Sequence, residues 1–112
     1  MSTDVRNYKD IVIIDWGGEI TLGDGTVSLR QNIRDILKYG GKKILLNLGA
    51  VHCIDCSGVG VLISTYKTVT SNGGQFKILN LTHRIQELLA ITKLLTFFEV
   101  YNNEKVALES FN

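Results

Sequence analysis

Short apolar runs recur along the chain and predict buried strands. Residues 11–14 (Ile-Val-Ile-Ile), 44–48 (Ile-Leu-Leu-Asn-Leu) and 75–81 are the clearest of them. The pair Gly17-Gly18 is typical of a tight turn, and residues 19–22 alternate polar and apolar side chains. We therefore expect an antiparallel β-hairpin at the start of the chain, with its turn at the glycine pair.

Apolar residues at helical spacing occupy the intervals between these strands. In the first interval, Leu29, Ile33 and Ile36 share one face, and Gly40-Gly41 end the pattern. Four helices are predicted, and each has a residue suited to capping at its start. The candidate caps are Asp24 or Thr26, Ser57, Thr82 and residues 102–104. A last short strand, at an edge of the sheet, is predicted within residues 94–101.

The predicted order of elements is ββαβαβαβα. This order indicates an α/β fold in which helices flank a mixed β-sheet through right-handed crossovers. The chain has 112 residues, no proline and no repetitive or linker-like segment, so we expect a single domain over residues 1–112. Residues 1–10 are polar, and we expect them to be a loose lead-in without a signal peptide.

Charge and composition narrow the classes of partner. Twelve basic and eleven acidic residues give a formal net charge of +1, which favours neither nucleic acid nor an anionic membrane surface. No apolar run approaches the roughly 20 residues that a membrane-spanning helix needs. Two cysteines in a chain without a secretory signal predict a reducing, cytoplasmic setting.

The strongest candidate site is the stretch Ile54-Asp55-Cys56-Ser57-Gly58-Val59-Gly60, between an apolar strand and the second helix. We expect Ser57 to be the N-cap of that helix, and Gly58 and Gly60 to leave the amides of its first turn uncovered. A phosphate on Ser57 would add about −1.5 to −2 charges at the positive end of the helix. The fold would tolerate this charge, while the surface that a partner meets would change.

A second loop is expected beside this stretch. Residues 23–26 follow one predicted strand, as residues 52–57 follow another. If the two strands are parallel neighbours, their carboxyl ends lie at the same edge of the sheet, where α/β proteins usually bind their ligands. Asp24 and Ser57 would then be close together.

Residues 43–62, with the stretch 55–62 (Asp-Cys-Ser-Gly-Val-Gly-Val-Leu) at their centre, resemble the signature of the STAS domain. More narrowly, they resemble bacterial anti-sigma factor antagonists, whose usual pattern is Asp-Ser-Ser-Gly-(Leu/Ile/Val)-Gly before an apolar helix. Residues 18–22 and 73–78 resemble the second and fourth strands of that family, and the resemblance covers residues 11–111. Cys56 departs from the pattern, which usually has a second serine there.

The resemblance implies a mechanism and a set of contact residues. The unphosphorylated protein binds an anti-sigma factor, which is also a serine kinase, and so frees the sigma factor. The kinase phosphorylates the serine before the first glycine, here Ser57, which abolishes binding, and a serine phosphatase resets the system. The implied partner-binding residues are Asp24, Gly25, Asp55, Cys56, Ser57, Gly58, Val59 and Gly60. STAS domains also serve as non-switching scaffold or accessory modules of sensory or transporter complexes, and this alternative stays open, as does the oligomeric state.

Other chemistries are disfavoured by the positions of the reactive side chains. Cys53 and Cys56 form a C-x-x-C pair, but the predicted helix begins after the second cysteine, and Asp55 between them disfavours a thiolate. His52 and the two cysteines would give zinc three ligands, whereas a closed structural site needs four. The motifs G-x-S-x-G and G-x-x-x-x-G-K-[ST] are absent. We therefore expect no enzymatic activity, no metal and no cofactor.

Overall fold

The structure is a computed structural model that describes residues 2–21, 23–91, 93 and 98–111. The described strands are β1 (Ser2–Tyr8), β2 (Ile11–Ile20), β3 (Lys43–Ile54), β4 (Gln75–Leu79) and β5 (Val100–Tyr101). The described helices are α1 (Asp24–Lys38), α2 (Cys56–Ser71), α3 (His83–Ile91) and α4 (Glu104–Glu109). Their order is ββαβαβαβα, as the sequence predicts.

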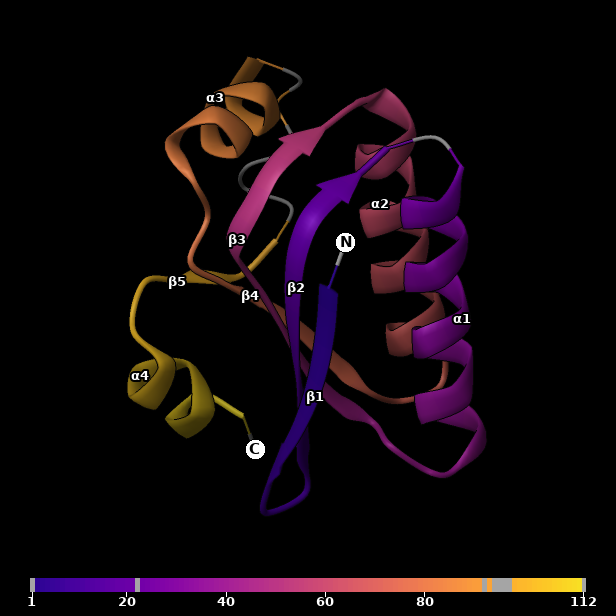
Figure 1. Ribbon diagram of the computed structural model, residues 1–112. Helices are drawn as coiled ribbons and strands as arrows, with labels where there is room; N and C mark the ends of the chain where they lie inside the picture. The colour runs from indigo at the N-terminus through magenta and orange to yellow at the C-terminus, as the bar shows by residue number, and fades with distance from the viewer. Residues whose placement is uncertain (1, 22, 92, 94–97, 112) are drawn as a thin grey trace.

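The strands form one mixed sheet in the order β1-β2-β3-β4-β5. β1 is antiparallel to β2, and each later neighbouring pair is parallel. Helices α1 and α2 cover one face of the sheet, and α3 and α4 lie on the opposite side (Figure 1). The predicted α/β fold with helices flanking a mixed sheet is confirmed. Within the described ranges, no helix is both long and apolar enough to cross a membrane.

The chain does begin with an antiparallel β-hairpin, but the predicted strands and the predicted turn of this hairpin were wrong. Residues 11–20 form the single strand β2, and its antiparallel partner β1 lies in the segment that we expected to be loose. The chain reverses at Lys9-Asp10, where Lys9 has a φ of 55°. At Gly18 the φ is 99°, and the pairing with β3 shifts register on both sides of residues 17–18. The glycine pair therefore produces an irregularity within β2, and the chain continues in the same direction.

The main core lies between the sheet and the two long helices. Trp16, Leu46 and Leu62 are among its fully buried side chains, and Leu29 and Ile33 of α1 join them on the predicted face. A smaller cluster lies under α4 and consists of Ile11, Ile13, Leu45, Leu79 and Ala107. The sheet is thus covered on both faces, which accounts for the near-continuous apolar run in β3.

Side chains cap the first turns of the two short helices, α3 and α4, as the sequence predicts. The hydroxyl of Thr82 accepts the amide hydrogen of Ile85 at 3.4 Å, and Oδ1 of Asn103 accepts that of Val106 at 3.2 Å. The last strand, β5, lies at the edge of the sheet, also as predicted. Residues 94–97 of the region predicted to contain it lie outside the described residues.

A cluster of charged side chains fastens β1 to the α4 side of the sheet. Arg6 donates hydrogen bonds to both carboxylate oxygens of Asp15 on β2, with Nη2 3.0 Å from Oδ1, and to the carboxylate of Glu104 on α4. Asn47 of β3 donates a further hydrogen bond to Asp15 at 2.8 Å. The hydrogen bonds from Arg6 hold the pKa of the Asp15 carboxyl below its usual range. Strand β1 is therefore an integral part of the sheet.

Candidate functional site

The two candidate loops lie at the same edge of the sheet. β2 and β3 are parallel neighbours, and their last residues, Ile20 and Ile54, are paired. The starts of α1 and α2 follow these residues and lie together at the carboxyl end of the strands (Figure 1). The condition that brings the loop at 23–26 beside the Ser57 stretch is therefore met. The surroundings of Asp24 and Gly25 lie outside the described part of the structure, so their role in partner binding stays a prediction.

Asp55 is the N-cap of α2, and the prediction that Ser57 has this role was wrong. Asp55 has an extended backbone, with φ −112° and ψ −174°, and its Oδ1 accepts the amide hydrogen of Gly58 at 2.9 Å. The backbone oxygen of Asp55 accepts the amide hydrogen of Val59 at 3.0 Å. The helix therefore begins at Cys56, ahead of Ser57, because a carboxylate at position 55 reaches the third amide of the first turn.

Ser57 therefore does not cap the helix. It is the second helical residue, it is partly buried, and its hydroxyl makes no hydrogen bond with the residues that the structure describes. The first turn of α2 has no acidic side chain. A group added to this hydroxyl would therefore leave the cap of the helix in place.

The two glycines of the first turn have different roles. Gly58 is buried, and a Cβ atom there would lie 2.0 Å from the backbone oxygen of Ile20 and 2.6 Å from Cγ1 of Ile54. Glycine at this position thus lets α2 pack against the end of β2. The expectation that it bares an amide was wrong, because Asp55 occupies the amide of Gly58. Gly60 is exposed, and a Cβ atom there would meet nothing within 4 Å.

The accessible part of the predicted site is smaller than the sequence suggested. Val59 is only 5% exposed and belongs to the core, so its side chain is not available to a partner. Cys56 and Gly60 are exposed, and Asp55 and Ser57 are partly exposed. We call these four residues the Ser57 surface.

Sequence reasoning missed an exposed apolar residue at this end of the molecule. Val27, in the first turn of α1, is 65% exposed. A signal was available, because Val27 lies outside the spacing that places Leu29 and Ile33 on the core face.

The end of β3 also contacts α3, where Arg84 donates to the backbone oxygen of His52 at 3.5 Å.

Two cysteines and a histidine lie near the site. Cys53 and Cys56 both carry free thiols, with Cys53 partly buried and Cys56 exposed. Within the described ranges, no group of three or more His, Cys, Asp or Glu residues is arranged to hold a metal ion.

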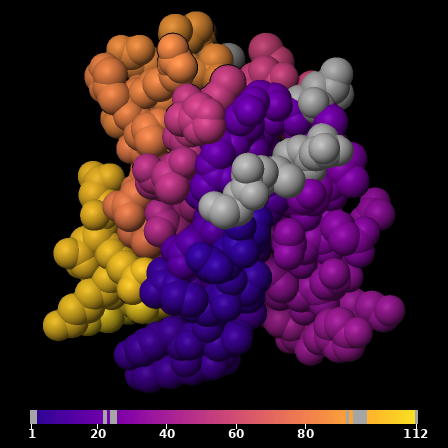
Figure 2. All heavy atoms as spheres, viewed as in Figure 1, coloured from indigo at the N-terminus to yellow at the C-terminus, as the bar shows by residue number. Residues whose placement is uncertain are grey.

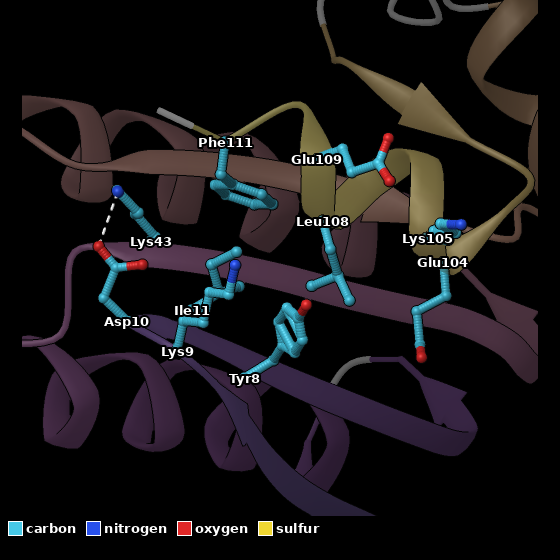
Figure 3. Close-up of a pocket in the computed structure, with 10 residues that line it drawn as sticks. All are labelled: Tyr8, Lys9, Asp10, Ile11, Lys43, Glu104, Lys105, Leu108, Glu109 and Phe111. Atoms are coloured by element: carbon cyan, nitrogen blue, oxygen red, sulfur yellow. Dashed lines mark hydrogen bonds and ion pairs between the residues drawn. The ribbon is translucent and has the colours of Figure 1, made fainter.

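A hollow lies at the opposite end of the sheet. It has a volume of about 580 Å³ and is formed by the β1–β2 turn, the start of β3, helix α4 and Phe111 (Figure 3). Tyr8, Leu108 and Phe111 give it an apolar lining, and an ion pair between Lys43 and Asp10, 2.7 Å long, lies at its edge. None of the residues of the predicted site lines this hollow. The candidate site is therefore an open surface at the helix starts.

Residues 2–107, which include both helix starts and the whole sheet, match the family description "STAS domain". This chain belongs to the STAS domain family. A relative from Thermotoga neapolitana, named as a candidate anti-sigma factor antagonist, is 31% identical over 101 residues, covering 90% of this chain and 89% of the relative. The anti-sigma-B factor antagonist of Bacillus subtilis is 28% identical over 100 residues, covering 89% of this chain and 90% of that protein.

A solved structure shows the same STAS fold. The Bacillus cell fate determinant SpoIIAA, solved in its phosphorylated form, superposes with a TM-score of 0.75 at 18% identity, covering 96% of this chain and 97% of that one. At this level of identity the likeness concerns the fold.

Proposed function

We propose that this STAS domain is an anti-sigma factor antagonist whose binding to its partner is switched off by a phosphate on Ser57. One observation carries the proposal: Asp55 caps α2, so Ser57, which is partly exposed, is not needed as the cap. The names of the two relatives support the antagonist role. The solved phosphorylated form of SpoIIAA supports a phosphate on this fold.

The physical basis of the switch is a change of charge on a surface that is otherwise almost neutral. The Ser57 surface contains one carboxylate, Asp55, which is engaged with the amide of Gly58. A phosphate would bring about −1.5 to −2 charges and three acceptor oxygens to this surface. The positive end of α2 offsets part of that charge within the molecule. A partner that fits the unmodified surface closely would instead meet a bulky, hydrated anion.

The partner in this proposal is an anti-sigma factor that is also a serine kinase. Exposed Gly60 lets another protein approach the backbone of α2 closely, and Val27 offers an apolar contact on the neighbouring helix. A serine phosphatase would restore the binding form by removing the phosphate. This cycle needs no catalytic residue from the STAS domain itself.

A phosphorylation and binding experiment tests the proposal. The protein is incubated with the cognate kinase and ATP, the mass is measured, and binding to the anti-sigma factor is measured by calorimetry before and after. We expect one added phosphate and at least a tenfold loss of affinity, on the order of 1.4 kcal/mol. Ser57→Ala should accept no phosphate and should bind throughout. Ser57→Asp should bind weakly and keep its thermal stability, because the Asp55 cap remains.

Ser71 provides the matched control. It is at the far end of the same helix, is exposed, and donates its hydroxyl to the backbone oxygen of Lys67 at 2.6 Å. Ser71→Ala should be phosphorylated and inactivated as the wild type is. A phosphate found elsewhere, with Ser57 unmodified, would overturn the proposed acceptor. Undiminished binding by phosphorylated protein would instead indicate the non-switching scaffold role.

A further inference from the structure

Strand β1 leaves a long backbone edge of the sheet unpaired. It has seven residues, Ser2–Tyr8, and among the described strands it pairs only with β2, so its other edge faces outward. Its indigo residues lie at the front surface of the molecule in Figure 2. The opposite edge strand, β5, has only two residues. An exposed edge strand of this length presents hydrogen-bonding groups to which another strand can be added.

The sequence of β1 is complementary to itself when two copies run antiparallel. With Val5 opposite Val5 of a second copy, Asp4 lies opposite Arg6, and Thr3 lies opposite Asn7. Each dimer would therefore contain two cross-strand pairs of opposite charge, one on each side of the two-fold axis. Such directly opposed pairs stabilise an antiparallel ladder. Moving the register by two residues in either direction removes this match.

The groups needed for these pairs are available in the single chain. Asp4 is exposed and lies directly opposite Asp15 in the β1–β2 register, so its nearest cross-strand neighbour has the same charge. Arg6 uses Nε and Nη2 for Asp15 and Glu104, and its Nη1 makes no hydrogen bond with the described residues. Arg6 of one copy can therefore donate to Asp4 of the other while keeping its contacts within the chain.

On the other face of β1, Val5 lies in a partly apolar groove that a second copy would cover, and Asn7, Asp10 and Asp35 also line this groove. Val5 is 48% exposed and lines a groove of about 490 Å³ between β1 and the end of α1. Ile36 and Tyr39 form the helix side of this groove, and Tyr39 is 84% exposed. A two-fold axis perpendicular to the sheet places the α1 helices of the two copies on the same side. Val5 and Tyr39 of the copies would then face one another along a shared apolar seam.

We propose that two copies of this chain associate through β1, antiparallel and centred on Val5, to form one continuous ten-stranded sheet. We choose a second copy as the partner of this edge because the charges of β1 are complementary to those of another β1 strand that runs antiparallel to it. This inference is independent of the switch at Ser57, because Val5→Lys and Val106→Lys, which test the association, leave the Ser57 surface unchanged.

Sedimentation of the full chain across the micromolar range tests the association. We expect the mass to rise from that of one chain to that of two, and the dissociation constant to increase with salt, because exposed ion pairs are screened. Val5→Lys places two like charges opposite each other and should weaken the dimer at least tenfold. Val106→Lys is the matched control, because Val106 is 52% exposed but lies on α4, and this variant should associate normally.

Cysteine pairing tests the register in a background where Cys53 and Cys56 are serine. Val5→Cys should form an interchain disulfide much faster than Val106→Cys, because opposite residues of an antiparallel pair are within disulfide reach. Thr3→Cys should not pair with itself, but should pair when mixed with Asn7→Cys. A single-chain mass at every concentration, or pairing of Val5→Cys no faster than that of Val106→Cys, would overturn the proposal. Rapid self-pairing of Thr3→Cys would overturn it as well, because the register would differ.

Discussion

Helices α1 and α2 begin side by side at the same edge of the sheet, but their starts are built differently. At α2, the side chain of Asp55 caps the first turn, and Gly58 packs against the backbone oxygen of Ile20. At α1, the N-cap is Gly23, with φ 111° and ψ −132°, which has no side chain to accept a hydrogen bond from the first turn. Thr26 instead donates its hydroxyl to the backbone oxygen of Gly23 at 3.0 Å.

The difference shows how the same edge can hold one start that is fixed by a side-chain cap and close packing, and one that depends on the backbone conformation of a glycine. At α2, a carboxylate and a close backbone contact determine where the helix begins, so the position of Ser57 is set by groups on both sides of it. At α1, the conformation depends on Gly23, where an added Cβ atom would meet nothing within 4 Å. Substitutions at the two starts should therefore act through packing at one and through backbone conformation at the other.

The largest effect is expected from Gly58→Ala. The added methyl group would meet the backbone oxygen of Ile20 at 2.0 Å, and backbone atoms can move away only by shifting β2 or α2. We expect a loss of about 3 kcal/mol in the free energy of unfolding, measured in urea. Gly60→Ala is the control two residues along the same helix, and it should raise stability by up to about 1 kcal/mol. If the two variants were equally stable, α2 would not rest on the end of β2.

The role of Gly58 illustrates which parts of the site sequence reasoning could reach. The glycine pattern singles out this turn, and the order of the elements places it beside the start of α1. The atom that requires glycine, however, belongs to Ile20, which is far away in the chain and has no marker in the local sequence. Packing across the ends of two strands becomes visible only when their register is known.

Two other errors have equally specific causes. Asp55 and Ser57 are both good N-cap residues, and only the backbone angles and the bond to Gly58 decide between them. Strand β1 is polar because both its faces are largely exposed and its outer edge is open, so it lacks the alternating pattern that revealed the other strands. By contrast, the helices and inner strands bury a consistent face, and their type and order could be predicted.

A smaller effect is expected from Gly23→Ala at the start of α1. No atom within 4 Å would obstruct the methyl group, but a φ of 111° is strained for any residue with a Cβ atom. We expect a loss of about 2 kcal/mol, measured by thermal or urea unfolding. Gly60→Ala is again the control, because it also adds a methyl group into open space, but at a helical φ. An equally harmless Gly23→Ala would show that α1 can begin in another conformation.

A still smaller effect is expected from removing the cap of α2. Asp55→Ala leaves the amide of Gly58 without its acceptor and should lower the free energy of unfolding by about 1 kcal/mol. Asp55→Asn keeps an acceptor oxygen and should change stability by only a few tenths of a kcal/mol. Asn103→Ala removes the equivalent cap of α4, so its loss of stability can be compared directly with that of Asp55→Ala.

The same measurement on Ser57→Ala separates the two residues that could have been the cap. Because the Ser57 hydroxyl makes no hydrogen bond with the described residues, this variant should be close to wild type in stability. A loss at Ser57→Ala that equalled the loss at Asp55→Ala would mean that Ser57 helps to hold the turn. In that case a phosphate there would disturb the start of α2 itself, and the contrast between a fixed helix start and a freely modifiable hydroxyl would fail.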